Sequence, residues 1–129
     1  VGSFLVKHLR INWTEGEKYF RNCLLDFNKA NNVAQWQWVA GCGADAAPYF
    51  RIFNPILQGE KFDKQGLYVK KWLPELEKVP SNFIHKPWEM ELKFQQEIKT
   101  IIGKDYPQPI VIHEKARVAA LEAFKTLKK

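Results

Sequence analysis

The chain holds 129 residues, 46% hydrophobic and 26% charged, a balance typical of folded globular proteins that argues against disorder. Its 20 basic and 14 acidic residues leave a net charge of +6, and no apolar run approaches the ~18 residues that a membrane-spanning helix needs. The first residues carry no signal-peptide pattern, and the start at Val1 fits a piece of a longer protein. We therefore expect one domain, or part of one, without a membrane segment.

The first third of the chain predicts three helical segments. Residues 4–9 show short helical spacing, and a stronger helix opens at Trp13, with Thr14 as N-cap and Glu17 at the capping-box position. A third helix is expected to start at an Asn31–Asn32 cap and to stop at Gly41 or Gly43. The second helix should bury an apolar face in i, i+3, i+4 spacing, made of Tyr19, Phe20, Cys23, Leu24 and Phe27.

The remainder of the chain also favours helices joined by ordered loops. Residues 46–59 contain two prolines and predict a loop with short helical turns, whereas residues 62–73 predict a helix. Residues 80–87 connect to a long helix over 88–102, ended by Gly103, with Trp88, Leu92, Ile98 and Ile101 or Ile102 facing inward. Prolines hold residues 105–112 extended, and a basic amphipathic helix covers 113–129. Because no stretch alternates with period 2, we predict an all-α fold of about six helices.

An uncharged run over residues 31–44 carries two tryptophans and the clearest functional signal. Asn32 and Trp36 are four residues apart and share a helix face, whereas Trp38 lies about 200° away from Trp36. Core packing explains such tryptophans in most proteins. The alternative is a planar ligand against Asn32 and Trp36, with Trp38 stacking on a second flat partner.

The segment that follows mixes small residues, aromatic residues and two cations. Arg51 and Lys61 fit a loop that meets a phosphate backbone while neighbouring aromatic side chains anchor it. The alternative is an ordinary loop in which Arg51 pairs with Asp45 or Asp63. We interpret the basic residues near the end as a solvated helix face; they are Lys115, Arg117, Lys125, Lys128 and Lys129.

Other catalytic patterns are poor. His8, His85 and His113 form no HxxxH or HExxH motif, and no glycine-rich phosphate loop occurs. Cys23 and Cys42 stand in no zinc-like spacing, so we expect neither a structural metal nor a disulfide scaffold. Hydrolytic triads and metal-dependent hydrolysis are not supported.

Five motifs, in order along the chain, resemble the flavin-binding region of DNA photolyases. They are NNVAQWQW at 31–38, DAAPYFRIFNP at 45–55, QGEKFD at 58–63, WLPEL at 72–76 and DYPQPIV at 105–111. The resemblance covers essentially the whole chain and is strongest to bacterial class I enzymes that repair cyclobutane pyrimidine dimers. It implies that residues 1–129 are the C-terminal portion of an all-helical FAD-binding domain, beside a cavity for a flipped-out dimer.

In that family, reduced FAD absorbs blue light and passes an electron to the dimer in DNA. By position, Asn32 resembles the asparagine that faces flavin N5, and Trp36 and Trp13 resemble the proximal and middle members of an electron-hopping chain. Cryptochromes usually carry an acid or a cysteine at the position of Asn32, so this residue favours a photolyase over a photoreceptor. The segment Asp26, Phe27 and Asn28 resembles the one at the isoalloxazine edge, where Asn28 replaces a frequent acid.

The same resemblance implies a DNA surface. Trp38 corresponds to the indole that stacks on the dimer, and Arg51, Gln58 and Lys61 correspond to contacts with the DNA around the lesion. The helix geometry agrees, because Trp38 leaves the face assigned to flavin. A cryptochrome-type photoreceptor and a cofactor-free basic DNA-binding domain are the alternatives.

Members of this family are several times longer than this chain. The resemblance therefore implies that the N-terminal antenna domain, its chromophore and the first part of the FAD domain lie outside it, together with the grip on the FAD phosphates. We expect the 129 residues alone to be inactive and to self-associate through exposed core surface. The parent is expected to act in the bacterial cytoplasm, at the nucleoid.

Overall fold

The computed structural model describes residues 1–46 and 50–126, and in these ranges the chain is helical without a β-strand. Its nearest approach to a strand pairing is one isolated bridge between Ile102 and Tyr106. The prediction of an all-α fold is confirmed. The chain divides into two compact units, of which the first comprises residues 1–53 and 111–129 and the second comprises residues 54–110.

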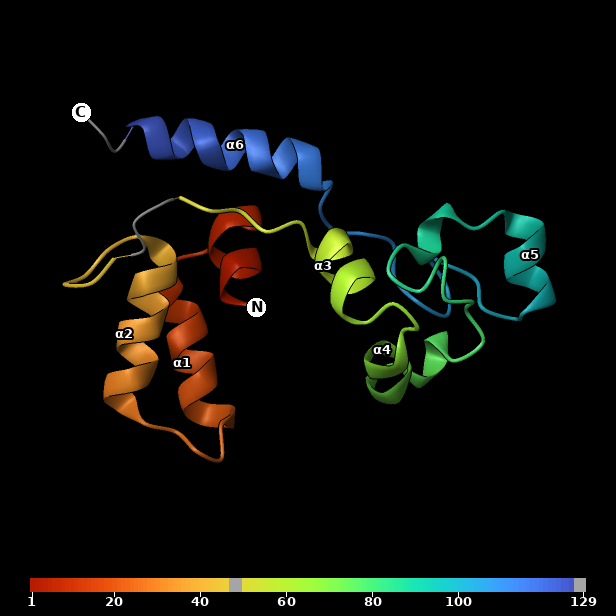
Figure 1. Ribbon diagram of the computed structural model, residues 1–129, viewed down its shortest axis with the longest axis horizontal. Helices are drawn as coiled ribbons and strands as arrows, with labels where there is room; N and C mark the ends of the chain where they lie inside the picture. Colours follow the sequence, from red (N-terminus) through yellow and green to blue (C-terminus); the bar gives the residue numbers. More distant parts are fainter. Residues whose placement is uncertain (47–49, 127–129) are drawn as a thin grey trace. The chain divides into compact units, whose positions relative to one another are not determined.

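In its described residues, the first unit contains three α-helices and one π-helical turn. α1 (Trp13–Cys23) and α2 (Lys29–Ala40) pack side by side (Figure 1). The turn η1 (Phe4–His8) contacts both of them and also the last helix, α6 (His113–Thr126). The expected helix at the end of the chain is therefore present, and residues 127–129 of that prediction lie outside the described residues.

The beginning of α1 differs from the predicted capping box. Asn12, not Thr14, is the N-cap, and its Oδ1 accepts hydrogen bonds from the backbone N and from Oγ1 of Thr14. Glu17 does not fold back to the cap but turns toward α2. The prediction failed because both Asn12 and Thr14 are good caps locally, and Glu17 finds stronger partners in the tertiary structure.

The ends of α2 were predicted with mixed success. The N-cap is Asn28, whose side chain accepts from the backbone N of Asn31, so the helix starts before the expected Asn31–Asn32 cap. At the other end Gly41 adopts a left-handed conformation with φ of 76°, as a C-terminal glycine is expected to do.

The apolar face predicted for α1 is mostly wrong. Tyr19, Cys23 and Leu24 are exposed, and the residues that α1 buries are Gly16 and Glu17. The physical reason is the partner helix: the wide Trp36 indole of α2 needs a glycine opposite it. A Cβ on Gly16 would lie less than 3.0 Å from three atoms of that ring.

The second unit contains short helices around a small core. They are α3 (Pro55–Phe62), α4 (Leu67–Trp72), the 3-10 turns η2 (Pro74–Leu76) and η3 (Pro87–Glu89), and α5 (Leu92–Glu97). Its core is apolar, with Leu76, Val79, Ile84, Met90 and Ile102 buried together.

The helix predicted over residues 62–73 is divided between α3 and α4. Gly66 lies in the left-handed region at φ of 69°, and an added Cβ would clash with Ile84. The Asp63 carboxylate then accepts from the backbone N–H groups of Tyr68 and Val69, which lie in the first turn of α4. In the expected loop over 46–59, residues 47–49 lie outside the described residues, and residues 55–59 belong to α3.

The long helix predicted over residues 88–102 is also wrong. Only α5 and the turn η3 form, and Leu92, expected to face inward, is 61% exposed. The buried Gln95 side chain donates to the Met90 carbonyl and accepts from the Ile102 backbone N, so it supports non-helical backbone on both sides. This arrangement lets Met90 and Ile102 enter the same core. Trp88 and Ile98 do pack against that core, as predicted.

No helix within residues 1–46 and 50–126 is long and apolar enough to cross a membrane.

Candidate functional site

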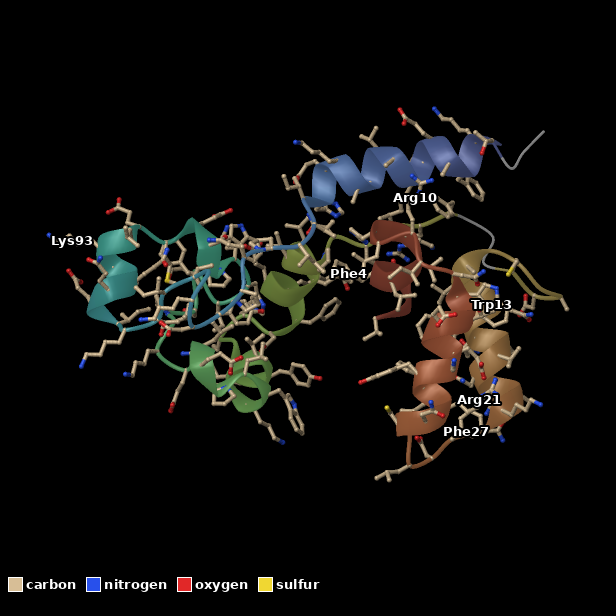
Figure 2. All side chains as sticks on the ribbon, turned by 180° about the vertical axis from the view of Figure 1, so that it is seen from behind. Phe4, Arg10, Trp13, Arg21, Phe27 and Lys93 are labelled. Carbon is tan, nitrogen blue, oxygen red and sulfur yellow. The ribbon has the colours of Figure 1, made fainter. Side chains whose placement is uncertain are left out.

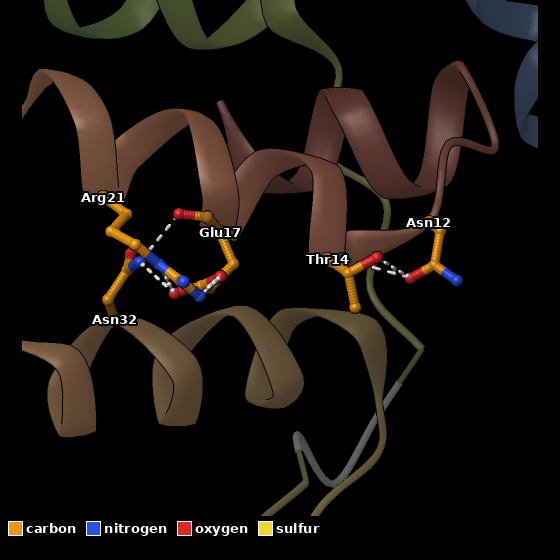
Figure 3. Close-up of polar contacts among 5 residues, drawn as sticks. All are labelled: Asn12, Thr14, Glu17, Arg21 and Asn32. Atoms are coloured by element: carbon orange, nitrogen blue, oxygen red, sulfur yellow. Dashed lines mark hydrogen bonds and ion pairs between the residues drawn. The ribbon is translucent and has the colours of Figure 1, made fainter.

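Asn32 is held on the buried side of α2 by the neighbouring helix. Its side chain is 8% exposed, and its Nδ2 donates to the backbone O of Glu17 at 3.0 Å and to Glu17 Oε1 at 3.1 Å (Figure 3). Because both N–H groups point at α1, the orientation of the amide is determined by the packing of the two helices.

Glu17 is in turn anchored within α1. Arg21, one turn later, donates from Nη2 to Glu17 Oε2 at 2.6 Å and from Nε to Oε1 at 3.2 Å (Figure 3). The hydrogen bonds from Arg21 hold the pKa of the Glu17 carboxyl below its usual range, and the bond from Asn32 acts in the same direction. The carboxylate therefore stays ionised at neutral pH and remains an acceptor for Asn32.

The remaining polar atom of Asn32 is its Oδ1. In the part of the chain that the structure describes, no group donates a hydrogen bond to this oxygen. An oriented amide oxygen of this kind is an acceptor for an N–H donor of a ligand. The Glu17–Arg21 pair leaves that oxygen free while fixing its direction.

Trp36 lies one turn along the same face and is 4% exposed. Its ring meets Phe20 edge to face, with centroids 5.2 Å apart and an interplanar angle of 76°, and it covers Gly16. The prediction that Asn32 and Trp36 share a face is confirmed. Core packing describes this tryptophan well within this chain, and its indole remains one turn from the free Asn32 oxygen.

Trp38 leaves that face, as its spacing predicts, and is 41% exposed. Trp13 is the first residue of α1 and is half-buried. α2 thus presents an amide and a buried indole on one side and an accessible indole on another.

The segment expected at the flavin edge lies between α1 and α2 (Figure 2, which labels Phe27). Asp26 is exposed, Phe27 is half-buried, and Asn28 uses its side chain to cap α2. Asn28 therefore has a local structural role as the N-cap of α2.

The residues expected to contact DNA fall on both units. Arg51 belongs to the first unit and is exposed, with its guanidinium 4.6 Å from the centroid of the Phe53 ring. Gln58 and Lys61 lie on α3 in the second unit, half-buried and exposed respectively. The alternative pairing of Arg51 with Asp45 or Asp63 does not occur among the described residues, and Asp63 instead caps α4.

Two features of the site were missed from the sequence, the glycine under Trp36 and the anchoring role of Glu17. The i, i+4 spacing of Glu17 and Arg21 is a recognisable ion-pair signal. Its connection to Asn32 depends on helix packing, which no spacing shows. Within residues 1–46 and 50–126, no three histidine, cysteine or acidic side chains gather as metal ligands, and Cys23 and Cys42 are free and exposed.

Comparison with known proteins agrees with the motifs. Residues 1–126 match the family model described as the FAD binding domain of DNA photolyase. The deoxyribodipyrimidine photo-lyase of Agrobacterium fabrum is 57% identical over 129 residues, which are all of this chain and 27% of that protein. The Escherichia coli protein of the same name is 53% identical over 127 residues, covering 98% of this chain and 26% of the relative.

Solved structures are similar in fold as well. A bacterial class III photolyase from Agrobacterium tumefaciens superposes with a TM-score of 0.92 at 56% identity, over 98% of this chain and 26% of that one. A Synechocystis cryptochrome gives a TM-score of 0.88 at 37% identity, over 94% of this chain and 25% of the cryptochrome chain. The chain thus spans about a quarter of the length of these relatives. The similarity to class I photolyases in particular stays a prediction. With its helical fold, its ordered motifs and a match over residues 1–126, this chain belongs to the family of DNA photolyase FAD-binding domains.

Proposed function

We propose that this chain forms one wall of the FAD and DNA sites of a longer photolyase that repairs cyclobutane pyrimidine dimers with light. The observation that carries the proposal is the oriented Oδ1 of the buried Asn32, which accepts no hydrogen bond from the described residues and lies beside Trp36 and away from the accessible Trp38. A fixed acceptor next to an indole fits the edge of a flavin ring, and an exposed indole fits a flat base.

The residues of this chain fit one edge of the cofactor. The Oδ1 of Asn32 would accept a hydrogen bond from the N5 side of the flavin. The segment Asp26, Phe27 and Asn28 would lie at the isoalloxazine edge. Bound reduced FAD would supply the light-excited electron that splits the dimer. Trp36 and Trp13 would pass electrons toward the flavin to return it to its reduced state. Glu17 and Arg21 keep Asn32 in place and so would position the acceptor.

DNA contact is assigned to the cations and to the exposed indole. Trp38 would stack on the dimer, and Arg51, Gln58 and Lys61 would meet the surrounding DNA. Both Arg51 and Lys61 are exposed and neither forms an ion pair within the described residues, so each is available to a phosphate.

The remaining parts of the site would come from the rest of the polypeptide. The relatives are about four times longer, which supports an N-terminal antenna domain and a first part of the FAD domain outside these residues. Several large apolar side chains are exposed, among them Leu25, Phe62 and Trp72, and these would be covered by that remainder or by a second copy. The parent would work in the cytoplasm, on nucleoid DNA.

The experiment is light-driven repair of an oligonucleotide with a single pyrimidine dimer by the intact polypeptide that contains residues 1–129. Trp38→Ala should weaken binding of the damaged DNA by about tenfold, since base–aromatic stacking contributes about 1–3 kcal/mol. Trp36→Phe should abolish photoreduction of the flavin and leave repair intact once the flavin is chemically reduced. Tyr19→Phe, at an exposed aromatic residue of α1 to which no FAD or DNA contact is assigned, is the control and should change neither quantity.

A cryptochrome-type photoreceptor is the second candidate, supported by the similarity to the Synechocystis cryptochrome. The two candidates separate in the same assay. FAD binding without repair of dimer-containing DNA would favour the photoreceptor and contradict our proposal. Salt-sensitive binding of undamaged DNA that depends on Arg51 but not on Trp38 would instead favour a cofactor-free DNA-binding domain.

The isolated 129 residues are expected to be inactive. A visible absorption spectrum taken before and after addition of FAD tests whether this part of the pocket retains the ring. A flavin band that saturates on titration would show that the Asn32 edge suffices for binding, and repair by the isolated chain would contradict the expected inactivity.

A further inference from the structure

A cavity of about 420 Å³ opens in the first unit, and neither Asn32 nor Trp36 lines it. η1, the start of α1, the end of α2 and the inner side of α6 all contribute to its wall. This volume lies within the range of pockets that hold small organic molecules. None of the residues assigned to FAD or DNA lines it except Trp13.

Lys7 is the most unusual residue in this wall. Lys7 is only 5% exposed, yet among the described residues no carboxylate lies within ion-pair distance of its ammonium group. Its Nζ donates to the backbone O of Arg51 at 2.6 Å and lies 4.9 Å from the centroid of the Phe50 ring. Burial lowers the pKa of its ammonium. Buried charges are normally paired, so this cation lacks a counter-charge.

A second cation lines the same cavity. Arg10 follows η1 (Figure 2) and has a left-handed backbone with φ of 56°, a conformation that favours glycine and is costly for arginine. No ion pair of Arg10 is found in the described part of the chain. Two cations therefore border one cavity, and its lining contains no acidic residue.

The rest of the lining is largely apolar and aromatic. It includes Val6, Ile11, Trp13, Phe50 and Phe124, and small side chains from α6 leave room between them. An occupant that matches this wall combines a negative group with a flat apolar body. The bare phosphate of a DNA backbone would satisfy the cations but would leave the aromatic wall uncovered.

We propose that this cavity is a binding site for a small aromatic anion, whose charged group meets Lys7 and Arg10 and whose ring lies against the aromatic wall near Trp13. A carboxylate and a phosphate monoester share this chemistry. Apart from Trp13, the site shares no lining residue with the FAD and DNA sites proposed above, and its occupant supplies the counter-charge that Lys7 lacks. Binding weakens as the pH rises and the ammonium loses its proton.

The test is calorimetric titration of the intact polypeptide that contains residues 1–129 with four probes. Benzoate and phenyl phosphate carry a ring and a charge, benzyl alcohol carries the ring alone, and inorganic phosphate carries the charge alone. One or both aromatic anions should bind at least about tenfold tighter than either partial probe. Preference between benzoate and phenyl phosphate identifies the charged group.

Variants then connect binding to the cavity. Lys7→Met keeps the length of the side chain and removes a buried charge, so it should fold, and it should weaken binding of the aromatic anion about tenfold or more. Arg10→Gln should weaken it less, because Arg10 is exposed. Ala123→Leu narrows the cavity from α6 and should abolish binding of the ring-bearing probes. Lys18→Met, an exposed lysine of α1 outside the cavity, is the matched control and should leave binding unchanged.

Three results would overturn the proposal. Equal affinity for benzyl alcohol and for both aromatic anions would remove the role of the charge. Undiminished binding by both Lys7→Met and Ala123→Leu would place the probe elsewhere. Absence of binding by either aromatic anion in the intact polypeptide would show that the cavity is filled or covered there. Repair of the pyrimidine dimer is measured in parallel on the unsubstituted polypeptide. Absence of repair would contradict the proposed function without contradicting the anion site.

Discussion

The amide of Asn32 donates both of its N–H groups to one residue of the neighbouring helix, to the backbone O and to the carboxylate of Glu17. A single residue therefore determines which way the amide faces. Because Arg21 holds the same carboxylate, the orientation of Asn32 depends on an ion pair inside α1 as well as on the packing of α1 against α2.

Replacing Asn32 with alanine should destabilise the first unit by about 1–3 kcal/mol, because the buried Glu17 loses one donor to its backbone O and one to its Oε1. Urea unfolding measures the change. Asn31→Ala is the matched control, since Asn31 is exposed on the same helix and its side chain makes no hydrogen bond in the described structure. Equal losses in the two variants would show that the Asn32–Glu17 contact is not stabilising.

Gly16→Ala should disrupt the contact between α1 and α2. The added Cβ would overlap the buried Trp36 ring, and we expect a net loss of about 1–3 kcal/mol although alanine favours helices. Near-ultraviolet circular dichroism should report a changed tryptophan environment. In Gly2→Ala the new Cβ would lie 3.4 Å from Val39, an ordinary contact, so that control should retain wild-type stability and spectrum.

In the second unit, Leu76→Ala should cost about 2–5 kcal/mol, because Leu76 is fully buried at the centre of the core. Leu92→Ala should change the free energy of unfolding by less than about 0.5 kcal/mol, because that side chain is exposed. Denaturant unfolding of both variants measures the contrast. A large loss in Leu92→Ala would instead support the long inward-facing helix that the sequence predicts.

Acid should weaken the first unit through a histidine pair. His8 Nε2 and His113 Nδ1 lie 2.8 Å apart, joining η1 to α6, and one ring must donate while the other accepts. Burial, followed by the nearby His113, lowers the pKa of His8. In the unfolded chain His8 has its ordinary pKa of about 6.5, so as the pH falls it takes up a proton there before it does so in the folded chain. Stability is therefore lost as the pH falls from about 6.5 through the lowered pKa of His8 in the folded state.

The check is urea unfolding at about pH 7.5 and about pH 5.5, on either side of the unfolded pKa. His8→Phe keeps the aromatic contact with Phe4 and should flatten the dependence on pH. His85→Phe, in the second unit, should preserve it. An unchanged acid loss in His8→Phe would assign the effect to other groups.

Helix boundaries and faces were predictable to different degrees. The end of α2 at Gly41 follows from local backbone chemistry, and the shared face of Asn32 and Trp36 follows from helical periodicity. The start of α1 could not be chosen, because Asn12 and Thr14 are both competent caps in isolation. The break of the helix expected over 88–102 depends on Gln95, whose side chain satisfies two backbone groups that a helix would otherwise use.

The candidate site was likewise predictable only in part. Ordered motifs identified Asn32, Trp36 and Trp38, and the family they indicate is confirmed by the match over residues 1–126. The motifs could not reveal that Glu17 orients Asn32, or that Lys7 lies buried beside a cavity with no ion-pair partner among the described residues.

By itself the sequence determined the helical class, the family and the faces of α2, because these depend on local periodicity and on residue types at short spacing. Only the tertiary structure decided that Gly16 lies under Trp36, that Asn32 presents its Oδ1, and that η1 meets α6 through His8 and His113. The physical reason is that such contacts join residues 15 to 105 positions apart. Their geometry follows from how the helices pack, and no local preference encodes that packing.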